Sequence, residues 1–200
     1  MDTLFQIIAI LLSYLLGAVP FGLVFSKLFS DVDVRTIGSG NIGATNVLRA
    51  AGKKAAVLTL LMDTMKGLVP VLIVKFLFQD DAITVLSGAA AILGHNFPVY
   101  LKFRGGKGVA TSYGVVVAVA PLTGLLCLII WALVAYIWRF SSLSALVSFA
   151  CYPGLTFFIT SPQSKPYGLL ALFIFGMIYY RHRDNIKRLL SGTEPKIGKK

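Results

Sequence analysis

Three polar segments interrupt an otherwise apolar chain, and they carry the residues whose chemistry suggests a function. The first, residues 38–49 (motif 1), reads GSGNIGATNVLR. Its glycines let the backbone approach a ligand closely, and Arg49 offers a planar fork of donors to an oxyanion. The other donors are Ser39, Asn41, Thr45 and Asn46. This combination suits a phosphate; the alternative is a Gly-rich turn that caps a helix and leaves Arg49 at a lipid interface.

Motif 1 also matches the letters GxGxxG of a dinucleotide-binding fold, and an acidic residue, Asp63, follows at the expected separation. No strand–helix–strand unit surrounds the match, and Asp63 lies in an apolar segment where that fold needs the end of a strand. We therefore reject a dinucleotide site.

The second segment, residues 104–111 (motif 2), reads RGGKGVAT. It is not a Walker A loop, because Gly108 stands where Ser or Thr is required. A Gly-rich turn that carries Lys107 into the start of a helix still supplies a charge and backbone N–H groups to an anion. The alternative is an ordinary basic loop at the cytoplasmic surface.

The third segment, residues 181–190 (motif 3), reads RHRDNIKRLL. His182 and Asn185 are three residues apart and share a helix face, which directs an imidazole and an amide into one polar site. The alternative is a basic helix beside the membrane that attracts anionic lipid head groups.

Isolated polar residues inside the apolar runs give weaker signals. Asp63 and Lys66 can neutralise each other at this spacing, either in a functional site or as a buried structural pair. His95 is expected to hydrogen-bond at a helix end. Cys127 and Cys151 lie in apolar runs without metal-ligand or disulfide spacing, so we expect no metal site.

The composition places these segments in a membrane protein. Hydrophobic residues make up 56% of the chain and charged residues only 14%, against about 25% in soluble domains. The net charge of +11 gathers in short segments beside apolar runs. This distribution follows the positive-inside rule and does not indicate nucleic-acid binding.

The apolar runs predict the elements that position the motifs. Residues 4–29 form one span with a kink near Pro20, residues 30–54 a polar connection, and residues 55–78 and 82–100 two further spans. Residues 109–138 divide near Pro121 into two short spans, and residues 143–159 and 167–180 complete the set. We therefore expect one all-α integral membrane domain, residues 1–200, with seven transmembrane helices, the N-terminus outside and the C-terminus cytoplasmic.

The alternative topology has five spans and a re-entrant hairpin. Residues 109–120 would extend only about 18 Å as a helix, short of the roughly 30 Å core of a bilayer. In both topologies all three motifs face the cytoplasm.

In order, GSGNIGATNVLR, GHNFPVYLKFRGGKGVAT and RHRDNIKRLLSGTE closely resemble the motif regions of the bacterial acyl-phosphate:glycerol-3-phosphate acyltransferases, and the likeness covers nearly the whole chain. The resemblance implies an enzyme of phospholipid biosynthesis in the bacterial inner membrane, with no metal or coenzyme. It implies acyl phosphate as donor, glycerol 3-phosphate as acceptor and 1-acyl-glycerol 3-phosphate as product. Contact with the enzyme that produces the acyl phosphate is a further expectation.

The resemblance also implies the site residues. The phosphate-binding positions are Ser39, Asn41, Thr45 and Arg49 in motif 1, and Gly105, Gly106, Lys107 and Gly108 in motif 2. Ser142, His182 and Asn185 complete the site, and Glu194 has a structural role.

An acyl phosphate is already activated, so we expect direct attack by the acceptor hydroxyl without a covalent intermediate. Lys107 and Arg49 would stabilise the departing phosphate and Asn185 the carbonyl oxygen, while His182 or a substrate phosphate takes the proton. The alternative function is a transporter of phosphate or another small anion. A transporter is expected to bind near the bilayer midplane, whereas these motifs lie at span ends.

Overall fold

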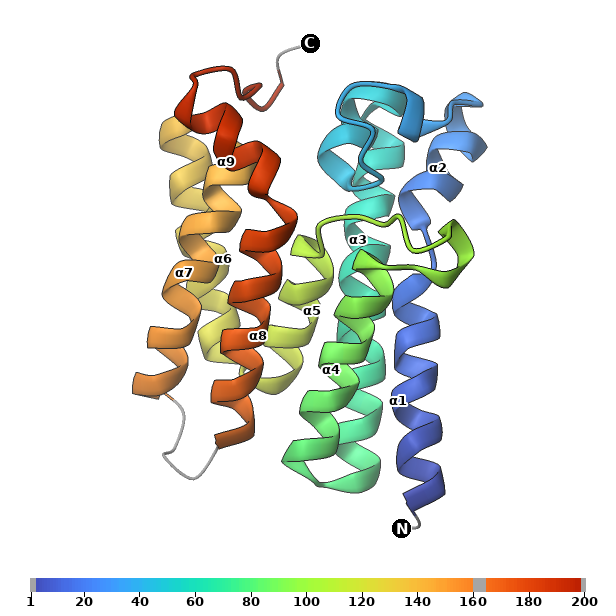
Figure 1. Ribbon diagram of the computed structural model, residues 1–200, viewed down its shortest axis with the longest axis vertical. Coiled ribbons are helices and arrows are strands. Elements are labelled where there is room, and N and C mark those ends of the chain that lie inside the picture. Colours follow the sequence, from blue (N-terminus) through green and yellow to red (C-terminus); the bar gives the residue numbers. More distant parts are fainter. Residues whose placement is uncertain (1–2, 160–164, 199–200) are drawn as a thin grey trace.

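The computed structural model describes residues 3–159 and 165–198, and these residues form helices and loops with no strand. The long helices run side by side as a bundle (Figure 1). The helical elements are α1 (Thr3–Ala18), α2 (Phe21–Ser30), the 3-10 helix η1 (Val34–Thr36), α3 (Ala44–Phe78), α4 (Asp81–Asn96), the 3-10 helix η2 (Val99–Leu101), α5 (Val109–Val119), α6 (Pro121–Trp138), α7 (Ser141–Ile159), α8 (Lys165–Arg181) and α9 (Arg183–Leu190).

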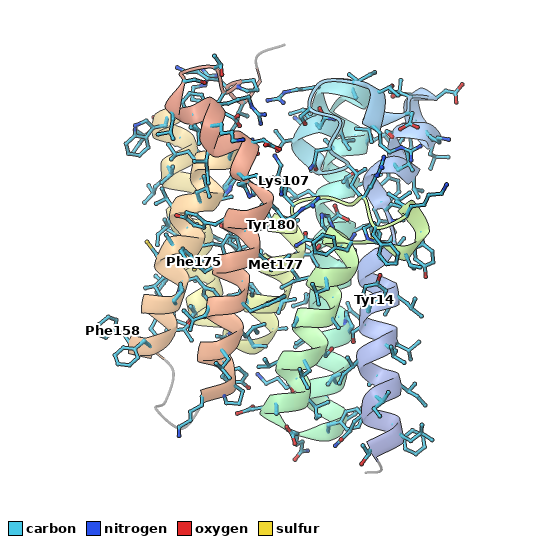
Figure 2. The ribbon with its side chains drawn as sticks, in the orientation of Figure 1. Tyr14, Lys107, Phe158, Phe175, Met177 and Tyr180 are labelled. Carbon is cyan, nitrogen blue, oxygen red and sulfur yellow. The ribbon has the colours of Figure 1, made fainter. Side chains whose placement is uncertain are left out.

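The bundle has the lengths and the outer surface of a membrane protein. Within the described residues, five helical segments are long and apolar enough to cross a membrane: Thr3–Ser30, Ala44–Phe78, Asp81–Leu101, Pro121–Trp138 and Ser141–Ile159. Large apolar side chains lie exposed along them; Phe158, for example, points outward from the end of α7 (Figure 2). The predicted all-α integral membrane fold is confirmed, while seven crossings and the orientation remain predictions.

Glycines let neighbouring helices pack at very short range. A Cβ on Gly17 of α1 would lie 2.2 Å from the Ala91 carbonyl oxygen of α4, and one on Gly114 of α5 would lie 2.1 Å from the Thr64 oxygen of α3. Small residues at helix contacts allow such close approach in membranes, where packing replaces hydrophobic exclusion as the main attraction. These contacts fix α1 against α4 and α3 against α5.

Both proline-based predictions agree with the structure. α1 ends at Ala18 and α2 begins at Phe21, so the first apolar run breaks at Pro20. α5 ends at Val119 and α6 begins at Pro121, which is the predicted turn. A proline cannot donate to the preceding turn, so it marks such breaks locally.

The predicted polar connection over residues 30–54 is largely helical in its second half. α3 begins at Ala44, inside motif 1, and continues through a kink at Gly52, whose φ of +83° lies in the left-handed region. Val47 is fully buried, and it packs with Ala55 beyond the kink. Packing of the short N-terminal segment, and not its polarity, therefore decides that motif 1 is half helix.

The helices bring all three motifs to one end of the bundle. In Figure 1 the loop before α3 and α9 lie at the upper end, and the loop before α5 lies below them in the upper half of the bundle. The opposite end carries Asp80, which caps α4, and Asp81, whose carboxylate accepts a hydrogen bond of 2.5 Å from the Tyr167 hydroxyl.

Candidate active site

A single buried amide organises motif 1. Asn46 is 2% exposed, and the two N–H groups of its Nδ2 are shared among three carbonyl oxygens, those of Val34 at 3.0 Å, Ile37 at 2.9 Å and Asn41 at 3.0 Å. Its Oδ1 accepts a 3.1 Å hydrogen bond from the Ser39 N–H. Asn46 therefore holds the Gly-rich loop and is a scaffold, not a free ligand donor.

Asn46→Ala is expected to destabilise the protein by about 2–4 kcal/mol, because buried carbonyl groups lose their donor. Thermal unfolding in detergent measures the loss. Thr36→Ala, which removes one exposed hydrogen bond in the same loop, is the matched control and should cost less than about 1 kcal/mol. Equal midpoints for the two variants would contradict the scaffold role.

The motif 1 candidates differ in what their side chains do. The Asn41 Oδ1 accepts a 2.8 Å bond from the Gly43 N–H at the start of α3, so part of this amide is used locally. Thr45 Oγ1 lies 3.2 Å from Ser141 Oγ, which brings motif 1 to the start of α7. Ser39 is exposed, and Arg49 makes no hydrogen bond or ion pair with the described residues. Ser39 and Arg49 are therefore available to a ligand.

The glycines of motif 2 let the loop lie directly on the last turn of α4. A Cβ on Gly105 would lie 2.2 Å from the His95 carbonyl oxygen, and one on Gly106 would lie 2.1 Å from His95 Nε2. Gly108 has a φ of +81°, and a Cβ there would lie 2.7 Å from Asn96 Oδ1. The three glycines are required by packing and backbone conformation, and they deliver Lys107 to the start of α5.

Lys107 meets motif 3 through a chain of short hydrogen bonds. Its Nζ donates to Asn185 Oδ1 at 2.5 Å, and Asn185 Nδ2 donates to Glu194 Oε1 at 2.6 Å. The same carboxylate oxygen accepts a 2.6 Å bond from Ser142 Oγ, and Arg188 Nε donates to Oε2 at 2.8 Å. Lys107, Asn185 and Ser142 are thus brought together, and Glu194 is the residue that joins them. Lys107 lies at the motif end of the bundle (Figure 2).

His182 lies one helical turn before Asn185 and is buried, with 2% exposure. Its Nδ1 lies 2.8 Å from the Ile178 carbonyl oxygen. A carbonyl can only accept, so Nδ1 carries the proton and Nε2 keeps a lone pair. Burial, followed by the charge of Lys107, lowers the pKa of His182 to about 4. The imidazole is therefore neutral and basic at Nε2 near neutral pH.

The pKa values of two charged groups near His182, those of Lys107 and Glu194, are also shifted. Burial lowers the pKa of Lys107 to about 8, although the carboxylate of Glu194 opposes this shift. Burial raises the pKa of Glu194, but the hydrogen bonds it accepts, beginning with that from Ser142, outweigh burial and leave the pKa below its ordinary value. At neutral pH the site holds an ammonium, a neutral imidazole and a structural carboxylate.

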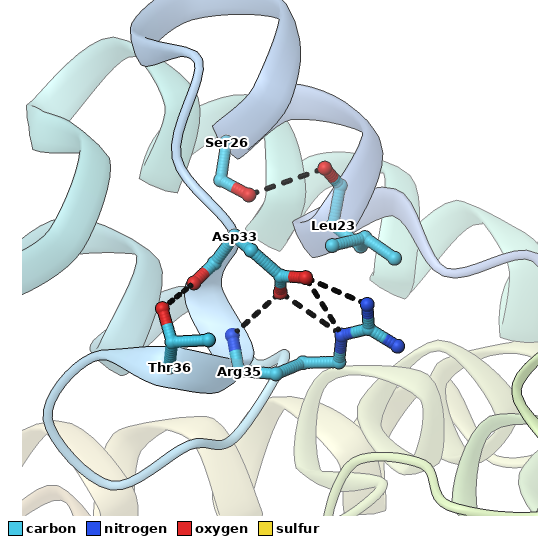
Figure 3. Close-up of polar contacts among 5 residues, drawn as sticks. All are labelled: Leu23, Ser26, Asp33, Arg35 and Thr36. Atoms are coloured by element: carbon cyan, nitrogen blue, oxygen red, sulfur yellow. Dashed lines mark hydrogen bonds and ion pairs between the residues drawn. The ribbon is translucent and has the colours of Figure 1, made fainter.

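A cleft of about 960 Å³ opens between motifs 1 and 2. Arg35 stands on its wall, held by a bidentate pair with Asp33 whose shortest distance is 2.6 Å (Figure 3). The hydrogen bond from Arg35 lowers the pKa of Asp33 to about 2. The lining residues are Asp33, Arg35, Thr36, Gly40, Ile42, Tyr100, Leu101, Lys102, Phe103, Arg104, Gly105 and Arg181. The cleft is basic and partly apolar, and its lining does not include Lys107, His182 or Asn185.

The sequence does not reveal the structural roles of two residues of this site. Asn46 reads as a ligand donor, whereas its bonds are all internal. Arg181 does not stand out in the sequence, yet it donates to the carbonyl oxygens of Gly106 at 3.0 Å and Gly105 at 2.8 Å. A basic residue beside a predicted site was the only available signal for Arg181.

Over residues 3–159 and 165–198, no group of three or more His, Cys, Asp or Glu residues could hold a metal ion.

Known proteins resemble this chain in sequence and in fold. A family model described as glycerol-3-phosphate acyltransferase matches residues 7–192. The glycerol-3-phosphate acyltransferase of Dinoroseobacter shibae is 52% identical over 190 residues, which is 95% of this chain and 92% of that protein. That of Caulobacter vibrioides is 50% identical over 194 residues, or 96% of this chain and 88% of that protein.

Two solved structures match the bundle. PlsY, an integral membrane glycerol 3-phosphate acyltransferase, in its glycerol 3-phosphate form is 41% identical with a TM-score of 0.90; the match covers 97% of this chain and 96% of that chain. Its lysophosphatidic acid form is 40% identical with a TM-score of 0.88 and the same coverage. The family match spans almost the whole chain, and motifs 1, 2 and 3 lie at one end of the shared fold. The chain therefore belongs to the glycerol-3-phosphate acyltransferase family and is an integral membrane acyltransferase.

Proposed function

We propose that this enzyme transfers a fatty acyl group from acyl phosphate to the primary hydroxyl of glycerol 3-phosphate, giving 1-acyl-glycerol 3-phosphate and inorganic phosphate. The observation that carries the proposal is the contact between Lys107 and Asn185, one helical turn from the neutral His182. Acyl transfer between two phosphorylated substrates needs an ammonium, an amide and a base. Lys107, Asn185 and His182 supply these three groups.

In the proposed reaction the acceptor hydroxyl oxygen attacks the acyl carbonyl carbon directly. His182 Nε2 takes the hydroxyl proton, and the bond between the carbonyl carbon and the phosphate oxygen then breaks. Lys107 stabilises the charge on the departing phosphate, and Arg49 is free to hold a substrate phosphate. Asn185 shares its amide between Lys107 and Glu194, so its role is to place the ammonium and to line the carbonyl site. Holding two substrates in register contributes about 7–11 kcal/mol in favourable cases.

We also propose that the protein lies in the bacterial inner membrane and that its site faces the cytoplasm. The motif end carries most of the basic residues, including Arg35, Arg104 and Arg139, whereas Asp80 and Asp81 lie at the other end. This asymmetry follows the positive-inside rule. An apolar donor then enters from the bilayer and glycerol 3-phosphate from water. Contact with the enzyme that supplies acyl phosphate stays a prediction.

The proposal is tested with purified protein, palmitoyl phosphate and labelled glycerol 3-phosphate. We expect lysophosphatidate acylated at the primary hydroxyl, with one phosphate released for each product molecule formed. Phosphate release without acylated glycerol 3-phosphate would show hydrolysis and contradict the proposed acceptor. Uptake of labelled glycerol 3-phosphate into vesicles without product would favour the transporter.

The pH profile of kcat/KM is expected to be bell-shaped, with limbs near pH 4 and pH 8. Activity rises with pH through about 4 as His182 loses its proton, and falls through about 8 as Lys107 loses its proton. The profile is measured in detergent and corrected for ionisation of both substrates. Lys107→Arg, which stays charged, should lose the basic limb. An acid limb that persists in His182→Gln would contradict the assignment to His182.

A further inference from the structure

A buried set of charged and polar residues lies inside the bundle, below motif 2. Asp63 and Lys66 of α3 are 2% and 6% exposed, and His95 of α4 is 4% exposed. Lys66 Nζ lies 2.7 Å from Asp63 Oδ1, and the same carboxylate oxygen lies 3.8 Å from His95 Nδ1. None of the three contacts Lys107, so the mechanism above does not use them.

The set is tied to the break in the first apolar run. Lys66 Nζ donates a 2.8 Å hydrogen bond to the Val19 carbonyl oxygen, directly before Pro20. Its ammonium also lies 5.6 Å from the centre of the Phe21 ring. Lys66 therefore joins α3 to the junction of α1 and α2. A buried ion pair is weak evidence for stability, because desolvation offsets its attraction, so fixing a geometry is the better explanation for this one.

On the other side, His95 forms the surface on which motif 2 rests. Its carbonyl oxygen accepts a 3.1 Å hydrogen bond from the Gly106 N–H, and its ring leaves no space for a side chain at Gly106. Arg181, the last residue of α8, donates to the carbonyl oxygens of Gly105 and Gly106. The loop is thus clamped between α4 and α8, one residue before Lys107.

We propose that Asp63, Lys66 and His95 are positioning residues. They fix the position of Gly106 relative to α4 and so place the Lys107 ammonium against Asn185. The inference rests on the proposed function, in which that ammonium stabilises the departing phosphate. Asp63 Oδ1 faces the His95 ring at 3.8 Å, the ring leaves no space at Gly106 and so supports the loop, and the loop carries Lys107. Their contribution to the reaction passes entirely through Lys107.

The test is a double-mutant cycle between His95 and Lys107. His95→Ala is expected to lower kcat/KM on the order of 100-fold, the effect of misplacing a reacting group by about 1 Å. In a Lys107→Met background the same change should cost less than about threefold, because nothing is left to position. An equal loss in both backgrounds would overturn the proposal, since a general structural defect acts regardless of Lys107.

The ion pair is tested by removing both charges together, because a single replacement leaves an unpaired buried charge. Asp63→Asn/Lys66→Met should show the same dependence on Lys107. Lys75→Met is the matched control: Lys75 also lies in α3 but donates at 3.3 Å to Ala118 and Val119, away from motif 2. We expect the control to keep activity within about twofold. Size-exclusion and thermal unfolding verify folding, and His95→Gln replaces His95→Ala if the latter does not fold.

A readout without turnover separates this inference from the proposed function. If the wild type shows no transfer, the proposed function fails, and positioning is then judged from the titration of the Lys107 amine by labelling and mass spectrometry. The wild-type pKa near 8 should rise toward the ordinary value in His95→Ala as Lys107 moves into solvent. The charged groups facing Lys107 are Glu194, Arg188, Arg181 and Asp184. An unchanged titration would overturn the inference.

Discussion

Lys107→Met is expected to lower kcat by about 10²–10³-fold, the loss that follows removal of one preorganised donor at a site of developing charge. Lys107 combines a fixed position with a partly buried environment, since its Nζ is held by Asn185 and burial lowers its pKa. A charge in such a site acts more strongly than one in water. Initial rates of phosphate release from palmitoyl phosphate, at saturating glycerol 3-phosphate, measure the loss.

Two variants control this measurement. Lys53→Met removes an exposed lysine from α3 and should change kcat by less than about twofold. Lys107→Arg keeps the charge but not the compact ammonium, so it should recover part of the activity. A loss below about tenfold in Lys107→Met would show that the departing phosphate is stabilised elsewhere.

The second large effect is expected at His182, where replacement by Ala should lower kcat by about 100-fold. The Ile178 carbonyl holds the ring in the tautomer with a free Nε2, and burial keeps that nitrogen unprotonated near neutral pH. No other described residue beside Lys107 combines these properties. Single-turnover rates with a bound donor measure the chemical step.

Arg183→Ala is the matched control for His182, because Arg183 is the exposed next residue and stacks on Tyr180. Its rate should stay within about twofold of the wild type. A loss of kcat below about tenfold for His182→Ala would contradict the role of His182 as the base. A phosphate oxygen of a substrate would then be the proton acceptor, and His182 would have a positioning role.

Much of the fold was predictable because its signals are local. Apolar runs set the spans, and Pro20 and Pro121 mark breaks where the structure has them. The start of α3 was not predictable in the same way. Gly52 reads as a loop residue in the sequence, whereas in the structure Val47 and Ala55, on the two sides of the kink, belong to one buried cluster.

The site was predictable as a set of motifs but not as a geometry. Each motif supplies donors that a reader of the sequence can identify, and Lys107 and Asn185 do meet. Glu194 accepts hydrogen bonds from Asn185 and Ser142, and this link forms only because the chain turns back after α9. The same holds for His95, which looks like an ordinary helix-end residue until the loop of motif 2 is seen lying on it.

In the proposed reaction an acyl phosphate, and not a thioester, supplies the acyl group. The most direct measurement compares initial rates of lysophosphatidate formation from palmitoyl phosphate and from palmitoyl-CoA at equal concentrations, with the same purified enzyme and glycerol 3-phosphate. We expect product from palmitoyl phosphate and a rate at least about 100-fold lower from palmitoyl-CoA, because the proposed role of Lys107 and motif 1 is to bind phosphate. Comparable rates from both donors, or product from palmitoyl-CoA alone, would contradict it.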